Sequence, residues 1–375
     1  MKNKYLLLVL SLIIKFNVII GQTLEWKSNV PGVVVAHSPK STNVFLGSPS
    51  IVILPNGNYL ASHDTFKNDG KLKIALTKIY LSKDKGSSWT QLCELNNQYW
   101  SSLFSYNNKV YLIGTSNSPG AVVIRESLDN GYSWSNPIDN KSGLLLPEPV
   151  YHCAPVPVVF HDGRIWRAME DCNGPYKVWG KEFRSFMMSA PIDSDWMDSS
   201  NWTFSNTLPY NENYLNGKFG GWLEGNAVVD KNGNIVNILR VDYRDPVEKA
   251  AIINISKDGK TASFDEETGF IQFPGGCKKF SIRYDKKTDL YWTISNYIPD
   301  DQRGHNVERT RNTQALSCSK DLKTWKVCKV ILHHPDVHHH GFQYIDWQFD
   351  GKDIIFLSRT AYDDGVGGAD NQHNA

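Results

Sequence analysis

Arg240 is a charged side chain inside an apolar segment, Ile238-Leu239-Arg240-Val241. A buried guanidinium without a counter-charge would be strongly destabilising. The sequence therefore leaves two interpretations open. Arg240 pairs with Asp242 or Glu224, or it waits for an anionic ligand, and both can hold in different states of the protein.

Two further segments place chemically useful side chains beside predicted strands. His152 stands at the entrance of a strand, with Pro155 fixing the backbone after it, and Arg167 follows the next turn. An imidazole in this position can meet a ligand, although a structural histidine is the alternative. The small-residue loop at 220–226 contributes Trp222, Glu224 and Asn226 before another strand.

A second cationic cluster lies in residues 275–284, a segment that opens with two glycines. Strand alternation places Lys279, Ser281 and Arg283 on one face of this segment. Such a face can bind an anion, and a solvated strand face is the alternative.

The densest histidine run, His333 to His340, suggests a metal. His334 and His340 could bind zinc together with Cys277, or with Cys318, because imidazole and thiolate are preferred zinc ligands. Exposed loop histidines are the alternative interpretation. We expect at most a structural zinc ion and no organic cofactor.

The elements that must position these residues are indicated by a repeated turn. Residues 82–89 and 127–134 share the pattern S-x-D-x-G-x-S-W, residues 319–325 carry a shortened copy, and residues 256–261 carry a degenerate one. The aspartate accepts hydrogen bonds from turn amides and hydroxyls, the glycine takes a positive φ, and the tryptophan fills the space between sheets. The repeat therefore has a structural role.

Apolar hairpins lie between these turns. Four turn at Asn56-Gly57, Asp162-Gly163, Asn232-Gly233 and Asp350-Gly351, and two weaker ones turn at Asn107-Asn108 and Lys286-Lys287. Six hairpins without a convincing amphipathic helix between them predict an all-β fold, a β-propeller. A propeller is one domain, so residues 22–375 are predicted to form a single domain.

Composition limits the class of protein. The chain has 375 residues and a formal charge of +1, which argues against a nucleic-acid partner. Residues 1–21 have the basic head, apolar core and small-residue end of a secretory signal. No later segment is apolar enough to span a membrane, so we expect a secreted or periplasmic monomer. The pairing of its six cysteines stays open.

The repeated turn is the Asp-box found in sialidases and other propeller enzymes that act on glycans. In addition, the segments "YHCAPVPVVFHDGRIWRAMED", "GGWLEGNAVV", "FPGGCKKFSIRYD" and "HHGFQYIDWQFDGKDIIFLSRTAYDD" resemble the propeller-type ulvan lyases and their relatives. That group also includes exo-acting enzymes that remove rhamnose from glucuronate. The resemblance implies seven blades and a canyon on one face, whereas six hairpins are counted, and closure of the ring could use the N-terminal strand.

The resemblance implies β-elimination on a uronate-containing anionic polysaccharide such as ulvan. Arg240 would neutralise the uronate carboxylate, His152 would remove the C5 proton, and Tyr243 or Tyr284 would complete the site. The other expected substrate contacts are Lys279 and Arg283 to sulfate or a second carboxylate, Trp222 to a sugar face, and Arg167, Glu224 and Asn226.

Three alternatives stay open. A related exo-α-L-rhamnosidase would use an early histidine such as His37 on the other face of the propeller. A sialidase is less favoured, because the sequence has no Phe-Arg-Ile-Pro element and no early triad arginine before Arg125. A non-catalytic glycan-binding propeller is the third.

Overall fold

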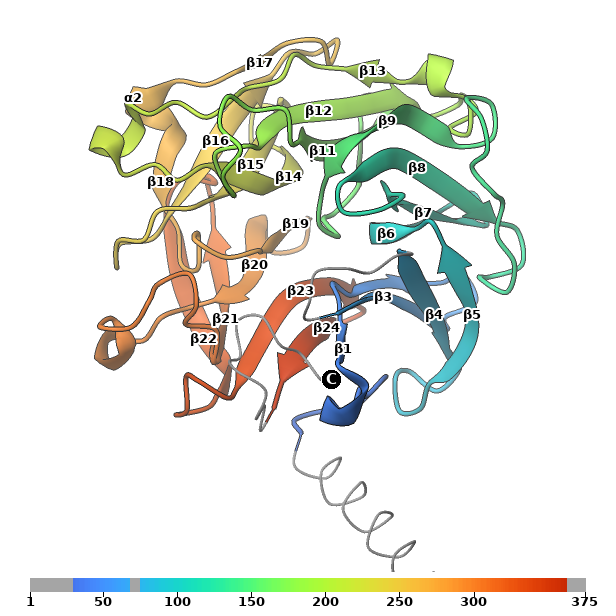
Figure 1. The fold of residues 1–375 in the computed structure, drawn as a ribbon, viewed down its shortest axis with the longest axis horizontal. Coiled ribbons are helices and arrows are strands. Elements are labelled where there is room, and N and C mark those ends of the chain that lie inside the picture. Colours follow the sequence, from blue (N-terminus) through green and yellow to red (C-terminus); the bar gives the residue numbers. More distant parts are fainter. Residues whose placement is uncertain (1–29, 68–74, 363–375) are drawn as a thin grey trace, which may run out of the picture.

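The computed structural model describes residues 30–67 and 75–362, and nearly all of its regular structure is β-strand. Antiparallel sheets stand around a central axis like the blades of a propeller (Figure 1). The predicted all-β propeller is thus confirmed. The predicted signal, residues 1–21, lies outside the described residues. Within the described ranges, no helix is long and apolar enough to cross a membrane.

The described strands form six blades. The first contains β1 (Val44–Leu46), β2 (Ser50–Ile53), β3 (Tyr59–Lys67), β4 (Leu76–Ser82) and β5 (Thr90–Asn96). The second contains β6 (Tyr99–Tyr106), β7 (Lys109–Thr115), β8 (Gly120–Ser127) and β9 (Leu144–His152). The third contains β10 (Val159–His161), β11 (Arg164–Asp171), β12 (Arg184–Pro191) and β13 (Thr203–Phe204).

The remaining blades follow in chain order. The fourth contains β14 (Trp222–Val229), β15 (Ile235–Val241), β16 (Lys249–Ile255), β17 (Ala262–Ser263) and β18 (Phe270–Gln272). The fifth contains β19 (Ser281–Asp285), β20 (Leu290–Asn296), β21 (Thr313–Ser319) and β22 (Trp325–His333). The sixth contains β23 (Gly341–Asp350) and β24 (Asp353–Ala361). The short helices are η1 (Lys40–Thr42), η2 (Ser199–Asn201), η3 (Tyr214–Gly217), α2 (Glu266–Gly269) and η4 (Asp300–Gln302).

The six predicted hairpins correspond to one pair of strands in each blade: β2–β3, β6–β7, β10–β11, β14–β15, β19–β20 and β23–β24. Each predicted turn joins a pair of antiparallel strands, from β2–β3 in the first blade to β23–β24 in the sixth. A seventh blade, which the family resemblance implied, does not occur among the described residues. The second and third blades merge into one sheet because β9 pairs with β11.

The repeated turns lie at the rim, between β4 and β5, β8 and β9, β16 and β17, and β21 and β22. In the first copy, Asp84 accepts hydrogen bonds from the backbone and hydroxyl of Ser88, and Ser82 Oγ accepts one from Gly86 N at 2.8 Å. The Trp89 indole donates to the Gly86 carbonyl at 3.2 Å. The second copy repeats these bonds around Asp129. The predicted structural role is confirmed.

Apolar side chains fill the wedges between consecutive blades. One cluster joins Leu60 and Ile79 of the first blade to Leu112 of the second. Similar clusters occupy the following interfaces up to the one between the fifth and sixth blades, where Ile294 packs on Trp347. Burial of these faces orders the ring, because each sheet has its neighbours on both sides.

Closure of the ring relies on a buried carboxylate. Asp346 of the sixth blade accepts hydrogen bonds from Ser50 Oγ at 2.7 Å and Ile51 N at 2.9 Å of the first blade. The N-terminal segment 33–36 and β24 line one cavity of about 400 Å³. Residues 33–36 therefore lie beside the short sixth blade without forming an assigned strand in it.

The innermost strands of the second, fourth and sixth blades each contain a β-bulge. At these bulges Trp100, Glu224 and Tyr344 have positive φ values of 51°, 56° and 53°. Non-glycine residues rarely adopt this conformation, and bulges re-aim side chains at functional sites. The repeated distortion near the axis therefore marks the positions from which a site can be built.

The preceding blade supports each bulge with a buried polar side chain. Asp64 accepts from Trp100 N at 2.8 Å, and Glu170 accepts from Glu224 N at 3.2 Å. In the sixth blade, the Asn296 amide donates to the carbonyl next to the bulge, that of Phe342, at 2.7 Å. Each bond offsets the loss of ladder hydrogen bonds at a bulge.

Asp64 is predicted to make stability depend on pH. Burial raises the pKa of Asp64 to about 7. The Thr77 hydroxyl lies 2.6 Å from Asp64 Oδ1 and 2.7 Å from the Gln98 carbonyl. Because that hydroxyl has one proton, a protonated Asp64 that donates to it satisfies all three groups.

The folded protein therefore holds a proton that the unfolded chain releases between about pH 4 and pH 7, and stability from this group declines as pH rises through that window. The decline is about 1.4 kcal/mol per pH unit at most. Asp64→Asn keeps both hydrogen bonds without titrating, so urea unfolding should show it gaining stability over the wild type as pH increases. Parallel stability curves for the two proteins would contradict this assignment.

Candidate active site

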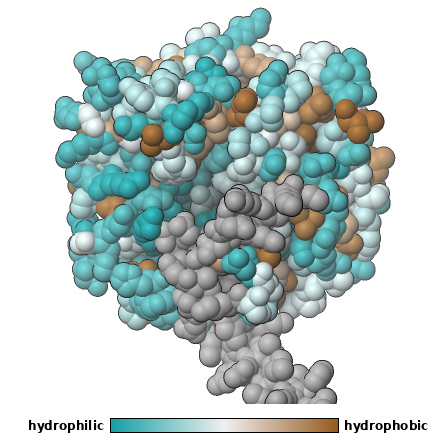
Figure 2. Space-filling view, viewed as in Figure 1, coloured by the Kyte–Doolittle hydropathy of each residue, from teal (hydrophilic) through white to brown (hydrophobic). Residues whose placement is uncertain are grey.

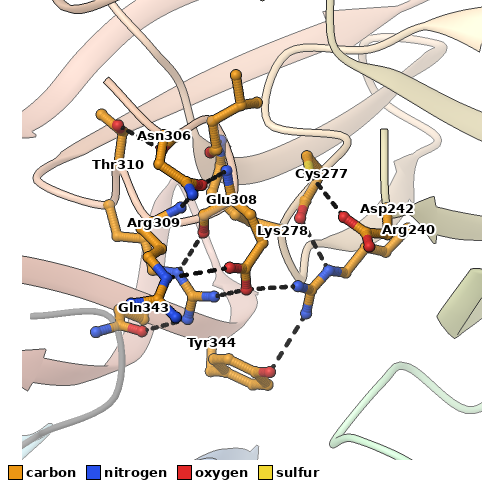
Figure 3. Close-up of polar contacts among 12 residues, drawn as sticks. Arg240, Asp242, Cys277, Lys278, Asn306, Glu308, Arg309, Thr310, Gln343 and Tyr344 are labelled. Atoms are coloured by element: carbon orange, nitrogen blue, oxygen red, sulfur yellow. Dashed lines mark hydrogen bonds and ion pairs between the residues drawn. The ribbon is translucent and has the colours of Figure 1, made fainter. Parts of the chain in front are cut away.

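A network of ionised side chains surrounds Arg240 near the propeller axis. Arg240 Nη1 lies 3.0 Å from Glu224 Oε2, and Nη2 lies 3.2 Å from Glu308 Oε1. Its Nε donates to the Cys277 carbonyl at 2.9 Å. Figure 3 shows the guanidinium facing Glu308 and Tyr344. Of the two partners considered from the sequence, Glu224 is the one that pairs with Arg240, whereas Asp242 pairs with Arg244.

Tyr344 and Glu224 form a hydrogen-bonded pair within this network. The Tyr344 hydroxyl donates to Glu224 Oε1 at 2.8 Å, and Arg240 Nη1 lies 3.4 Å from the same hydroxyl. The two residues come from bulges on β14 and β23, on different blades. Each bulge turns its side chain toward the other, so the backbone distortion creates the pair.

The pKa values of this pair move in opposite directions. Burial opposes ionisation of Glu224, but the charge of Arg240 and the hydrogen bond from Tyr344 lower its pKa. Burial and the negative charge of Glu224 raise the pKa of Tyr344. At neutral pH the pair therefore consists of a neutral phenol and a carboxylate that can accept its proton.

Two more guanidiniums lie on the other side of Tyr344. The Arg359 guanidinium carbon is 3.9 Å from the centre of the Tyr344 ring, and Arg359 Nη2 donates to Gln343 Oε1 at 3.1 Å. Arg311 donates to the same oxygen at 2.6 Å and pairs with Glu308 at 2.8 Å. Three arginines from three blades or loops thus surround one phenol–carboxylate pair.

Arg359 differs from the other two arginines in its partners. It is 9% exposed, and burial lowers its pKa to about 10. Its hydrogen-bond and ring partners within residues 30–67 and 75–362 are the neutral Gln343 and Tyr344. Its Nε is buried without a hydrogen-bond partner there. Glu224, a carboxylate whose charge acts on the pKa of Arg359, is already paired with Arg240. A buried cation whose direct partners are neutral favours an anionic ligand.

His152 is linked to this network by hydrogen bonds. Its Nδ1 is 2.9 Å from Glu170 Oε1, and Glu170 also accepts from Glu224 N. The ring stacks on Phe183 and meets Trp100 edge-on. A chain of contacts through Glu170 and Glu224 therefore links His152 to Arg240.

The two predicted tyrosines lie apart from this network. Tyr284 is exposed at the hairpin end of β19, where it hydrogen-bonds Asp289 and contacts Lys231. Tyr243 contacts Lys249 after the end of β15. The tyrosine beside Glu224 is instead Tyr344, which the sequence analysis did not single out.

Several side chains predicted to contact substrate instead pack or hydrogen-bond within the fold. The structure corrects the prediction for Trp222, which is 1% exposed in the core between the third and fourth blades, so its ring cannot stack on a sugar. Arg167 is fully buried and donates to the Ala154 and Ala168 carbonyls. Asn226 accepts from Ile282 N at 3.0 Å and so joins two blades.

The predicted cationic face is also paired. Lys279 is buried, donates to Ser281 Oγ at 2.9 Å and to the Ile345 carbonyl, and burial lowers its pKa to about 8. Arg283 lies 3.2 Å from Asp346 Oδ1. These side chains join the fifth blade to the sixth, a role that explains their alternation without a ligand.

The structure does not assemble the predicted zinc ligands. Cys277 packs with Ile298 and Val307, whereas His334 and His340 stack on each other with ring centres 3.4 Å apart. Throughout the described ranges, no group of three or more histidine, cysteine or acidic residues is arranged to hold a metal ion. Cys318, the alternative ligand, lies 2.9 Å from Cys328 between their sulfur atoms.

Glu308, Arg311, Tyr344 and Arg359 are the functional candidates that sequence reasoning missed. Arg359 stands inside Ile354-Ile355-Phe356-Leu357-Ser358-Arg359, which is the signal that identified Arg240. Glu308 and Arg311 lie in the loop between β20 and β21, and neither a hairpin nor a motif marks that loop.

The buried network predicts a non-additive pair of substitutions. Arg240→Met leaves Glu224 and part of the Glu308 charge uncompensated, so we expect it to destabilise the fold by about 3–5 kcal/mol. Glu224→Gln combined with Arg240→Met should cost clearly less than the sum of the single substitutions. Urea unfolding of the four proteins measures this coupling, and additive costs would contradict the network.

Comparison with known proteins identifies the fold. No protein-family model matches the sequence, and no curated protein sequence matches it significantly. An α-L-arabinanase of Penicillium chrysogenum, solved with arabinobiose, is structurally similar, with 14% identity, a TM-score of 0.55 and coverage of 91% of this chain and 96% of that one.

Two further solved structures extend the likeness. A protein of unknown function from Dyadobacter fermentans has 15% identity, a TM-score of 0.58 and coverage of 91% and 98%. A Trypanosoma rangeli sialidase, solved with sialic acid, has 14% identity, a TM-score of 0.54 and coverage of 90% of this chain and 54% of that one. At these identities the similarity shows the β-propeller fold.

Proposed function

We propose that the protein is a secreted glycoside hydrolase that releases a terminal sugar carrying a carboxylate. The observation that supports this most strongly is the Tyr344–Glu224 pair surrounded by Arg240, Arg311 and Arg359. The structurally similar sialidase and arabinanase, which are carbohydrate-active enzymes by their names, agree with this class. The arginines favour the acidic sugar over neutral arabinose.

Tyr344 is proposed as the nucleophile. A carboxylate nucleophile would be repelled by a substrate carboxylate near the reacting carbon, whereas a phenol is neutral until the bond forms, and sialidases use a tyrosine in this way. As Tyr344 Oη bonds to the anomeric carbon, its proton moves to Glu224 Oε1, 2.8 Å away. The leaving group departs with the electron pair of the glycosidic bond.

The arginines divide two tasks in this proposal. Arg240, 3.4 Å from the Tyr344 hydroxyl, stabilises the oxygen as its proton leaves. Arg359, whose hydrogen-bond partner in the described structure is the neutral Gln343, binds the substrate carboxylate through charge-assisted hydrogen bonds. In the second step, water attacks the glycosyl carbon and Glu224 returns its proton to the departing Tyr344 oxygen. The proton that the water loses passes to the solvent and replaces the one that the leaving-group oxygen took from the solvent in the first step.

On sequence grounds a sialidase is disfavoured, because the chain has no early arginine. In the structure, the early segment Leu46-Gly47-Ser48-Pro49 has no room for an arginine side chain at Gly47, because an added Cβ would lie 2.7 Å from the Asp64 Cβ. The third guanidinium instead comes from β24 as Arg359. The proposal is therefore a hydrolase for acidic sugars and is not restricted to sialic acid.

β-Elimination is the second candidate. One observation supports it: His152, the base implied by the ulvan-lyase resemblance, is linked through Glu170 and Glu224 to Arg240, the implied cation. In the structure, however, Arg240 is already paired with two carboxylates. Ultraviolet absorbance of an unsaturated uronate on incubation with ulvan would identify this reaction.

Nitrophenyl glycosides test the hydrolase directly, because nitrophenolate leaves without protonation. We expect release of nitrophenol from the glycoside of sialic acid or glucuronic acid, and none above background from that of L-arabinofuranose. Tyr344→Phe should lower kcat/KM by roughly 10³-fold or more, since it removes the nucleophilic oxygen.

Tyr284→Phe is the matched control, because Tyr284 is exposed at the rim and outside the network. It should keep full activity. Preference for the neutral glycoside, or equal activity of Tyr344→Phe and the wild type, would overturn the proposal.

A further inference from the structure

The loop at 172–183, between β11 and β12, is firmly held beside the candidate active site. Arg184 grips Asp171 through two bonds of 2.8 Å and closes the base of the loop. Within it, Gly174 N donates to the Glu182 carbonyl at 2.7 Å, and Glu182 N donates to the Val178 carbonyl at 3.0 Å. The loop therefore has a defined shape and presents its side chains from fixed positions.

Two glycines bring this loop against the start of β14. Gly180 and Gly221 both have positive φ, and a Cβ added at Gly221 would lie 2.1 Å from the Gly180 oxygen. Side chains are excluded at this contact, so the two backbones touch. The contact places the residue before Gly180, Trp179, next to the strand that carries Glu224.

Trp179 lies between a buried charge and the solvent. Its ring centre is 5.3 Å from the Arg240 guanidinium carbon, and its edge meets Phe183. Trp179 is 42% exposed, whereas Arg240 is 1% exposed. The guanidinium thus covers part of the indole, and a large part of the ring remains open to a ligand. Figure 2 shows a face of the molecule on which the described surface is mostly hydrophilic.

We propose that Trp179 is a specificity residue that stacks on the leaving-group sugar, the one next to the sugar being cleaved; this inference rests on the proposed hydrolase. The reacting carbon must lie at the Tyr344 hydroxyl, which is 3.4 Å from Arg240 Nη1, whereas the Trp179 ring centre is 5.3 Å from the carbon of the same guanidinium. The guanidinium therefore separates the indole from the reacting position, and the exposed ring is placed to meet the neighbouring sugar. An aromatic ring offers an apolar face to the C–H groups of a sugar at little conformational cost.

Two substrates with the same acidic terminal sugar separate stacking from catalysis. One is the glycosyl fluoride, which has no leaving-group sugar, and the other is the lactose glycoside. For Trp179→Ala, the ratio of kcat/KM for the lactose glycoside to kcat/KM for the fluoride should fall roughly threefold to tenfold, mainly through KM. Trp179→Leu, which keeps an apolar cover over Arg240, should show the same fall, and Trp179→Phe should restore much of the ratio.

Tyr176→Ala is the matched control. Tyr176 is also 42% exposed and lies in the same loop, but its ring contacts Tyr210 and Lys181. It should leave the ratio unchanged. If the wild type hydrolyses both substrates and Trp179→Ala keeps the wild-type ratio, the stacking role is wrong while the hydrolase stands. If the wild type hydrolyses neither, both proposals are wrong.

Discussion

The pairing of Arg240 with Glu224 and Glu308 is the interaction on which the candidate active site depends. Each charge in this group is largely removed from water, and none would be stable there alone. Their mutual compensation keeps Glu224 ionised in a buried position and orients it toward Tyr344. The same network draws together β14, β15, the loop before β21 and β23, so the site and the closed ring support each other.

The propeller provides this arrangement through a repeated backbone device. Bulges on the innermost strands of alternate blades hold Trp100, Glu224 and Tyr344 at positive φ, and polar side chains of the preceding blades hold the distorted segments. The apolar wedges between blades make the ring rigid enough to maintain these positions. Residues from distant parts of the chain can then act on one sugar.

The sequence predicted the fold well because its signals are local. Asn56-Gly57 and the other turns define each hairpin, and the repeated Asp84-type turns define the rim. The sequence also named Glu224 as a possible partner of Arg240, because a charged residue in an apolar strand is unstable without a counter-charge. Tyr344, Glu308 and Arg311 were missed, since their role comes from neighbours on other blades and from a bulge with no sequence signature. Trp222 was misassigned because an aromatic residue beside glycines fits a core as well as a sugar site.

The central claim is that Tyr344, with Glu224 as its base, bonds covalently to an acidic sugar. The most direct measurement is intact-protein mass spectrometry after incubation with the fluoride of that sugar carrying a second fluorine next to the anomeric carbon, which slows breakdown of the intermediate. The account predicts an increase in mass equal to one fluorosugar, located by peptide mapping at Tyr344 and absent from Tyr344→Phe. A label on another residue, or turnover of the sugar without any label, would contradict it.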